Sequence, residues 1–163
     1  ATSHPCGTGM SAVLLGPFVS VGVAAVALLI QALFLAHGGL TTLGGNIFSM
    51  GILGSFSGYF AFKIAQRCRL SLFWCGFFAG MVSDLFTYLG TSIELGLLVI
   101  NKGGSFLKAT AEIFAVFMMT SQGILCIVEG VVVGLALLFI YKRKPSILLH
   151  LGVIKNDTKP IQV

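Results

Sequence analysis

Residues 10–35 read MSAVLLGPFVSVGVAAVALLIQALFL, an apolar run that is interrupted once, by Gly16-Pro17. An unbroken helix of this length would extend to about 40 Å, whereas the hydrocarbon core of a bilayer is about 30 Å thick. Proline also removes an amide donor and clashes with the preceding helical turn. Two arrangements are therefore open: one kinked helix, or a short half-span (Met10–Leu15) followed by a full span (Pro17–Leu35).

A histidine-containing loop flanks this run on each side. Residues 3–9 read SHPCGTG, and residues 36–46 read AHGGLTTLGGN. A neutral imidazole is a common ligand for divalent transition metals, which makes His4 the first candidate and His37 a weaker one. Cys6 offers a thiolate ligand, or it packs as a neutral thiol. The alternative is an interfacial loop that binds no metal. Tight turns and helix capping explain the glycines and threonines of residues 36–46, and Asn46 is expected to cap the next helix.

The composition is that of an integral membrane protein. Hydrophobic residues make up 56% of the 163 positions and charged residues 9%, and the mean hydropathy is +1.01. Because the apolar runs reach about 20 residues, we expect helices rather than the shorter strands of a barrel. The predicted fold is an all-α helical bundle in the lipid bilayer. The net charge of +5 does not indicate nucleic-acid binding, since the basic residues cluster beside apolar runs.

The remaining apolar runs complete a bundle of about four full spans and one half-span. The region 106–141 is too long for one span and too short for two, so it is divided into a helical lead-in and a span. We predict spans at 47–65, 70–100 and 121–141, a lead-in at 106–120, a transmembrane domain over 1–145 and a loosely ordered cytoplasmic tail over 146–163.

Basic residues predict the orientation in a cell membrane. They concentrate at 63–69 and 142–159 and are absent from 36–46. Because Lys and Arg mark cytoplasmic flanks, the C-terminus is predicted to be cytoplasmic and the His37 loop extracellular. A single crossing over residues 10–35 would leave His4 in the cytoplasm. A hairpin at Gly16-Pro17 would return His4 to the outer face, beside His37.

Several polar residues interrupt the spans. Asp84, Thr87, Tyr88 and Thr91 share one helical face, and charged groups in a span are expected to face the bundle. We favour interhelical hydrogen bonding, worth about 0.6 kcal/mol per contact, over a role in conduction. Ser3, Asn46, Asp84, Tyr88 and Glu129 are the predicted structural polar residues around a site, and Glu94, Glu112 and Gln122 are further buried candidates.

Smaller signals concern packing. The pairs Gly54/Gly58, Gly76/Gly80 and Gly130/Gly134 have the four-residue spacing that lets helices approach closely. The other three cysteines, at positions 68, 75 and 126, lie in or next to spans and are predicted to pack.

No motif predicts an enzyme. A Walker loop, a nucleophile elbow and an HExxH sequence are all absent, so this chain is not expected to power transport itself or to hold an organic cofactor. A membrane-embedded enzyme using Asp84, Glu112 or Glu129 would lack a paired base and nucleophile. A scaffold subunit without metal binding is the other alternative.

Several stretches resemble one family, the CbiM/NikM substrate-capture subunits of cobalt and nickel energy-coupling-factor transporters. SHPCGTG (3–9) is similar to its SHPTGTG loop, and residues 31–46 are similar to its QALxLAHGGLTTLGAN stretch. Further similarities are LLGP (14–17), NIFSM (46–50), SDLFTY (83–88) with Thr91-Ser92, and IVEG (127–130). The resemblance covers nearly the whole chain.

This resemblance implies the fold of those capture subunits and a function. Such a subunit captures Co(II) or Ni(II), its transported substrate, outside the membrane. It works with a transmembrane coupling protein and two ATPases, often with a small accessory membrane protein. The family holds the metal through an N-terminal Met-His segment and the histidine of the SHP loop, which corresponds to His4. The resemblance also favours the hairpin at Gly16-Pro17.

Two departures from the family pattern stand out. The sequence begins at Ala1 without the Met-His start, so we expect a segment upstream of it. Cys6 replaces the usual threonine.

Overall fold

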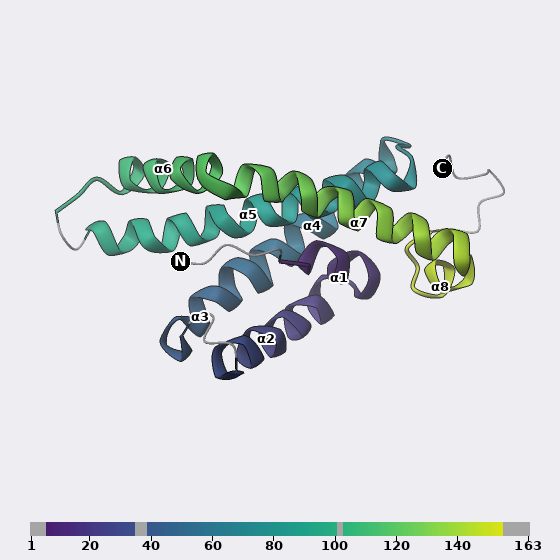
Figure 1. Cartoon of the computed structure of the whole chain (residues 1–163), viewed down its shortest axis with the longest axis horizontal. Coiled ribbons are helices and arrows are strands. Elements are labelled where there is room, and N and C mark those ends of the chain that lie inside the picture. The colour runs from purple at the N-terminus through teal and green to yellow at the C-terminus, as the bar shows by residue number, and fades with distance from the viewer. Residues whose placement is uncertain (1–5, 35–38, 101–102, 155–163) are drawn as a thin grey trace.

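The computed structural model describes residues 6–34, 39–100 and 103–154, and these residues form helices and connecting turns without a strand. Four helical runs are long and apolar enough to cross a membrane: Pro17–Phe34, Leu40–Arg67, Leu72–Ile100 and Phe106–Arg143. The predicted all-α fold, with about four full spans and a half-span, is confirmed. Figure 1 shows the long helices α5 (Leu72–Ile100) and α7 (Gly123–Arg143) running along the longest axis of the molecule.

The chain reverses at Gly16-Pro17, as the hairpin interpretation predicts. Helix α1 (Thr8–Leu15) is the half-span, and α2 (Pro17–Phe34) begins with the proline, where a missing amide donor costs least. Gly16 joins them with φ 85°, in the left-handed region that favours glycine. The two helices are linked through Ser20, whose hydroxyl lies 2.6 Å from Ser11 Oγ on α1 and 2.8 Å from Ser55 Oγ on α4 (Ser55–Arg67).

The next helical run starts earlier than predicted. A turn of 3-10 helix, η1 (Leu40–Thr42), leads into α3 (Leu43–Asn46), the π-helical segment η2 (Ile47–Gly54) and α4 (Ser55–Arg67). The expected cap at Asn46 is wrong, because Asn46 lies inside this run and its side chain makes no capping hydrogen bond. The run begins instead where the Gly39 amide donates to Thr42 Oγ1 at 3.0 Å, so Thr42 satisfies an amide that the helix leaves unpaired.

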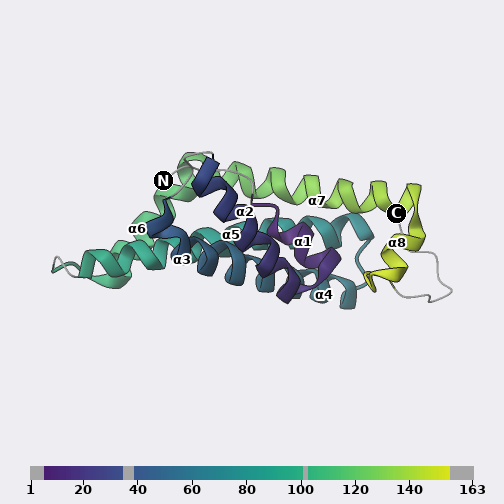
Figure 2. The same ribbon diagram turned by 90° about the horizontal axis from the view of Figure 1, so that it is seen from below.

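Helices α5 and α7 pack closely together, and Figure 2 shows them side by side from below. A Cβ at Gly76 would lie 2.9 Å from the Cα of Gly134, and one at Gly80 would lie 2.8 Å from the Glu129 carbonyl oxygen. The close approach predicted from the glycine spacing is therefore confirmed. The region 106–141 forms one helical run, with α6 (Phe106–Phe117) joined to α7 by the π-helical segment η3 (Met118–Gln122).

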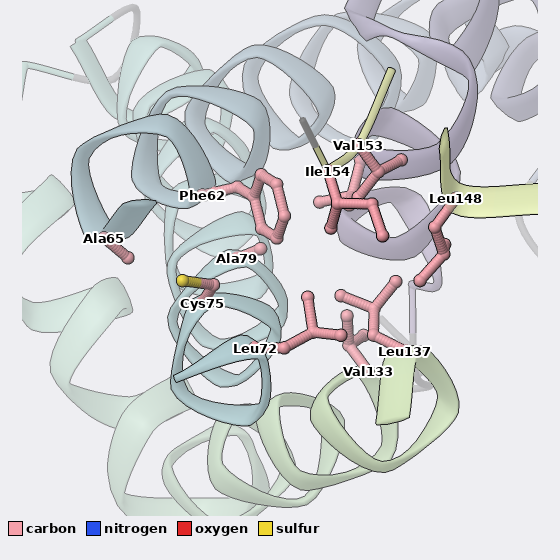
Figure 3. Packing of buried hydrophobic residues seen from close by; sticks show 11 residues of the cluster. Phe62, Ala65, Leu72, Cys75, Ala79, Val133, Leu137, Leu148, Val153 and Ile154 are labelled. Atoms are coloured by element: carbon pink, nitrogen blue, oxygen red, sulfur yellow. The ribbon is translucent and has the colours of Figure 1, made fainter. Parts of the chain in front are cut away.

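The C-terminal segment folds back onto the bundle. Helix α8 (Pro145–His150) buries Leu148 completely, and Val153 and Ile154 join the same apolar cluster as Phe62 of α4 and Leu137 of α7 (Figure 3). The side chain of Gln66 also donates to the Val153 carbonyl at 2.7 Å. The prediction of a loosely ordered tail is thus wrong for residues 146–154. The apolar side chains of this segment pack into the buried cluster formed by the other helices.

Candidate functional site

The segment that precedes α1 enters the bundle against Glu129 of α7. The Glu129 carboxylate accepts the amide of Cys6 at 2.8 Å and the amide of Gly7 at 2.9 Å. Gly7 has φ 66°, a left-handed conformation that glycine adopts without strain. Glu129 is 4% exposed, so its two oxygens exchange water for two backbone donors.

Asp84 of α5 lies between two thiols. Cys6 Sγ donates to Asp84 Oδ1 at 3.3 Å, and Cys126 Sγ donates to Asp84 Oδ2 at 3.0 Å. Asp84 is fully buried. We call Cys6, Asp84, Cys126 and Glu129 the thiol–carboxylate cluster; it joins the N-terminal segment, α5 and α7.

A pair of hydroxyls and two close approaches at glycines join the helices around this cluster. Thr8 Oγ1 lies 3.0 Å from Ser83 Oγ, one residue before Asp84. A Cβ on Gly9 would lie 2.8 Å from the Ala79 carbonyl oxygen, and a Cβ on Gly58 would lie 3.0 Å from the same atom. Helices α1, α4 and α5 can therefore meet there only while Gly9 and Gly58 lack side chains.

The cluster has the chemistry of a cation site. One ligand atom from each of Cys6, Asp84 and Glu129 lies within 4.8 Å of the other two. Burial, and then the charges of Glu129 and Asp84, raise the pKa of the Cys6 thiol well above its usual value. Cys6 is therefore a neutral hydrogen-bond donor at neutral pH.

The predicted site residues fall into three groups. Ser3, His4 and His37 lie outside the described residues. Cys6, Asp84 and Glu129 meet in the cluster. Tyr88 lies one turn further along α5 and is 7% exposed, with its ring 5.5 Å from that of Phe117 between centroids.

The remaining polar candidates differ in burial. Asn46 and Glu94 are partly exposed, and Gln122 is fully buried. Glu112 is wrong as a buried candidate, because its side chain is 66% exposed beside Lys108 on α6.

Two site residues were not predicted. Cys126 was expected only to pack, and Ser83 was not singled out. The sequence did contain one indication for Cys126: it lies three residues before Glu129, so the two side chains share one face of α7.

Comparisons with known proteins agree with the resemblance read from the motifs. Residues 1–147 match the CbiM family, described as a cobalt uptake substrate-specific transmembrane region. The chain is 49% identical over 153 residues to a protein of Sorangium cellulosum named "Cobalt transport protein CbiM", covering 94% of this chain and 67% of that protein. It is 42% identical over 152 residues to "Putative cobalt transport protein CbiM 1" of Methanosphaerula palustris, covering 93% and 65%.

A solved structure has the same fold. A crystal structure described as a transition metal transporter superposes with a TM-score of 0.75 at 28% identity, covering 87% of this chain and 65% of that one. The chain thus spans about two thirds of the length of these relatives. Because the family match takes in the motifs at both ends of the bundle and the fold agrees independently, this chain belongs to the CbiM family of cobalt uptake transmembrane proteins.

Proposed function

We propose that this chain is the membrane subunit that captures a divalent metal ion, Co(II) or Ni(II), at the extracellular face for an ATP-driven importer. Its membership of the CbiM family over residues 1–147 carries the proposal. The names of the relatives favour Co(II) as the substrate.

The proposed ligand is the His4 imidazole, completed by nitrogens of a Met-His segment like the one in the family. His4 is two residues before Cys6, whose amide and thiol are both held by carboxylates of the bundle. A ligand only two residues away from a fixed backbone position loses little conformational freedom when it binds metal. The cluster would then position the loop at residues 3–9, which carries His4.

The proposed partners are those of the family: a transmembrane coupling protein, two ATPase subunits and a small accessory membrane protein. The predicted orientation belongs to the same proposal, with the C-terminus in the cytoplasm and residues 4 and 37 outside. Cysteines introduced at positions 4 and 37 should react with an impermeant maleimide added outside intact cells. Labelling at position 4 only after the cells are opened would contradict this orientation.

Calorimetric titration tests metal capture. The chain extended by a Met-His N-terminus should bind Ni(II) and Co(II) tightly through nitrogen ligands. His4→Ala should abolish this nitrogen-ligated binding step, because water does not replace a lost nitrogen ligand at equal strength. Affinity should also fall as the pH drops through the imidazole range, since the ligands must be deprotonated.

His150 supplies the matched control. It lies at the exposed end of α8, so His150→Ala should bind like the parent. Equally tight binding with and without the added Met-His segment would contradict the ligand assignment. Absence of metal binding by the extended chain, together with stable association with a coupling protein, would instead favour a scaffold subunit.

A further inference from the structure

The thiol–carboxylate cluster has the ligands of a second metal site. We propose that its four side chains bind one divalent cation of the Zn(II) and Co(II) class in tetrahedral coordination, inside the bundle. The proposal does not depend on metal capture by His4, because it uses other side chains.

The separations in the cluster suit a tetrahedral ion. With Zn–S bonds of about 2.3 Å and Zn–O bonds of about 2.0–2.2 Å, the sulfur-to-oxygen edge of the tetrahedron is about 3.5 Å. Cys6 Sγ lies 3.3 Å from Asp84 Oδ1 and Cys126 Sγ lies 3.0 Å from Asp84 Oδ2, so each sulfur is close to the edge length from one oxygen of the same carboxylate. The Glu129 oxygen lies within 4.8 Å of the Cys6 sulfur and the Asp84 oxygen.

Charge balance also permits a divalent cation to replace the two thiol protons of the cluster. Two S–H bonds break, two sulfur–metal bonds form, and the two protons leave to solvent. One divalent cation replaces two protons, so the net charge of the cluster is unchanged. The bundle therefore buries no additional net charge when metal binds, which is the main obstacle to ions in low-dielectric surroundings.

The amide bonds to Glu129 do not exclude coordination. A carboxylate has about four acceptor positions, and the amides of Cys6 and Gly7 occupy one on each oxygen. Hydrogen bonds of this kind orient the carboxylates that ligate metals. They would hold Glu129 in place as the ion enters.

Gln122 gives a second, independent indication of a polar guest. It is the last residue of η3, four residues before Cys126 of α7. Gln122 is fully buried, yet neither its amide oxygen nor its amide nitrogen has a hydrogen-bond partner within the described ranges. A buried, unpaired amide is rare in folded proteins, so an unmet need for polar partners lies one helical turn from Cys126.

The test adds cobalt chloride to the full chain in detergent. All variants carry Cys68→Ser, because the exposed Cys68 thiol could bind cobalt itself. Addition of Co(II) should produce the visible bands of four-coordinate cobalt and a near-ultraviolet sulfur-to-cobalt charge-transfer band. Zn(II) should displace the cobalt and bleach both. Cys126→Ser should remove about half of the charge-transfer intensity, since one of two thiolates is lost, and weaken binding at least about tenfold.

Cys75 provides the matched control, because it is a buried thiol on α5 that donates to the Leu70 carbonyl at 3.5 Å. Cys75→Ser should leave the spectrum unchanged. His4→Ala should also retain the sulfur band, which separates this site from the capture site, whose nitrogen ligands give no such band. Loss of the band in His4→Ala would overturn the proposal of a separate site.

Two further outcomes would overturn the proposal. The first is no sulfur band from the Cys68→Ser chain at saturating Co(II), a result that requires no substitution in the cluster. The second is a band that persists when both Cys6→Ser and Cys126→Ser are present.

Discussion

The Glu129 carboxylate accepts the Cys6 amide at 2.8 Å across 123 positions of sequence. The same carboxylate accepts the Gly7 amide through its other oxygen. Two backbone donors, one on each oxygen, hold the carboxylate and the segment in a fixed relative position. One side chain on α7 therefore fixes where the N-terminal segment enters the bundle.

Replacing Glu129 by glutamine should loosen this segment. Glu129→Gln keeps one acceptor oxygen but presents an amide N–H₂ to a backbone donor, leaving a buried donor unpaired at a cost of about 1–3 kcal/mol. Thermal unfolding in detergent should show a lower midpoint. Glu112→Gln, on the exposed face of α6, should unfold like the parent; equal midpoints for both variants would contradict the anchoring role.

Cys6 should alkylate more slowly than Cys68 at pH 7. The thiolate is the reacting species, and the raised pKa of the Cys6 thiol keeps it protonated. Cys68 lies exposed in the turn between α4 and α5, contrary to the prediction that it packs. Mass spectrometry after a timed reaction with N-ethylmaleimide measures both rates, and faster labelling of Cys6 would mean that its segment does not stay against the bundle.

Gly76 should not tolerate a side chain. The Cβ of Gly76→Ala would lie 2.9 Å from the Gly134 Cα, a backbone atom that cannot move independently of α7. Overpacking of this kind costs about 1–3 kcal/mol. Gly22→Ala on α2 is the control, since its Cβ meets nothing within 4 Å and alanine favours helix. Chemical unfolding should show a loss for the first and none for the second.

The docking of α8 can be tested with two adjacent leucines. Leu148 is fully buried in the apolar cluster of the bundle, whereas Leu149 is 36% exposed. Leu148→Ala should cost about 2–5 kcal/mol of unfolding free energy, and Leu149→Ala distinctly less. Limited proteolysis should also cut near residue 150 faster in Leu148→Ala; equal cleavage of the two variants would show that α8 contributes little to the bundle.

The sequence alone determined the helical architecture. Lipid offers no hydrogen-bond partners, so apolar runs of this length must pair their own backbone groups as helices. Proline geometry predicted an interruption at Gly16-Pro17, and the family resemblance favoured the hairpin over a kinked helix. The glycine spacing predicted close helix packing without naming the partner helix. The turns within 35–46 were harder to predict, because glycine, threonine and asparagine suit both a loop and a helix start.

The tertiary structure decided which helices face one another. Helical periodicity places Asp84 and Glu129 on faces of their own helices, but it carries no information about which partner covers each face. The meeting of Cys6, Asp84 and Cys126 depends on the register between α5 and α7 and on the entry of a segment 78 positions away from Asp84. The burial of Leu148 likewise depended on an apolar cluster to which α1, α4, α5 and α7 contribute, and no local pattern at residues 145–154 encodes that cluster.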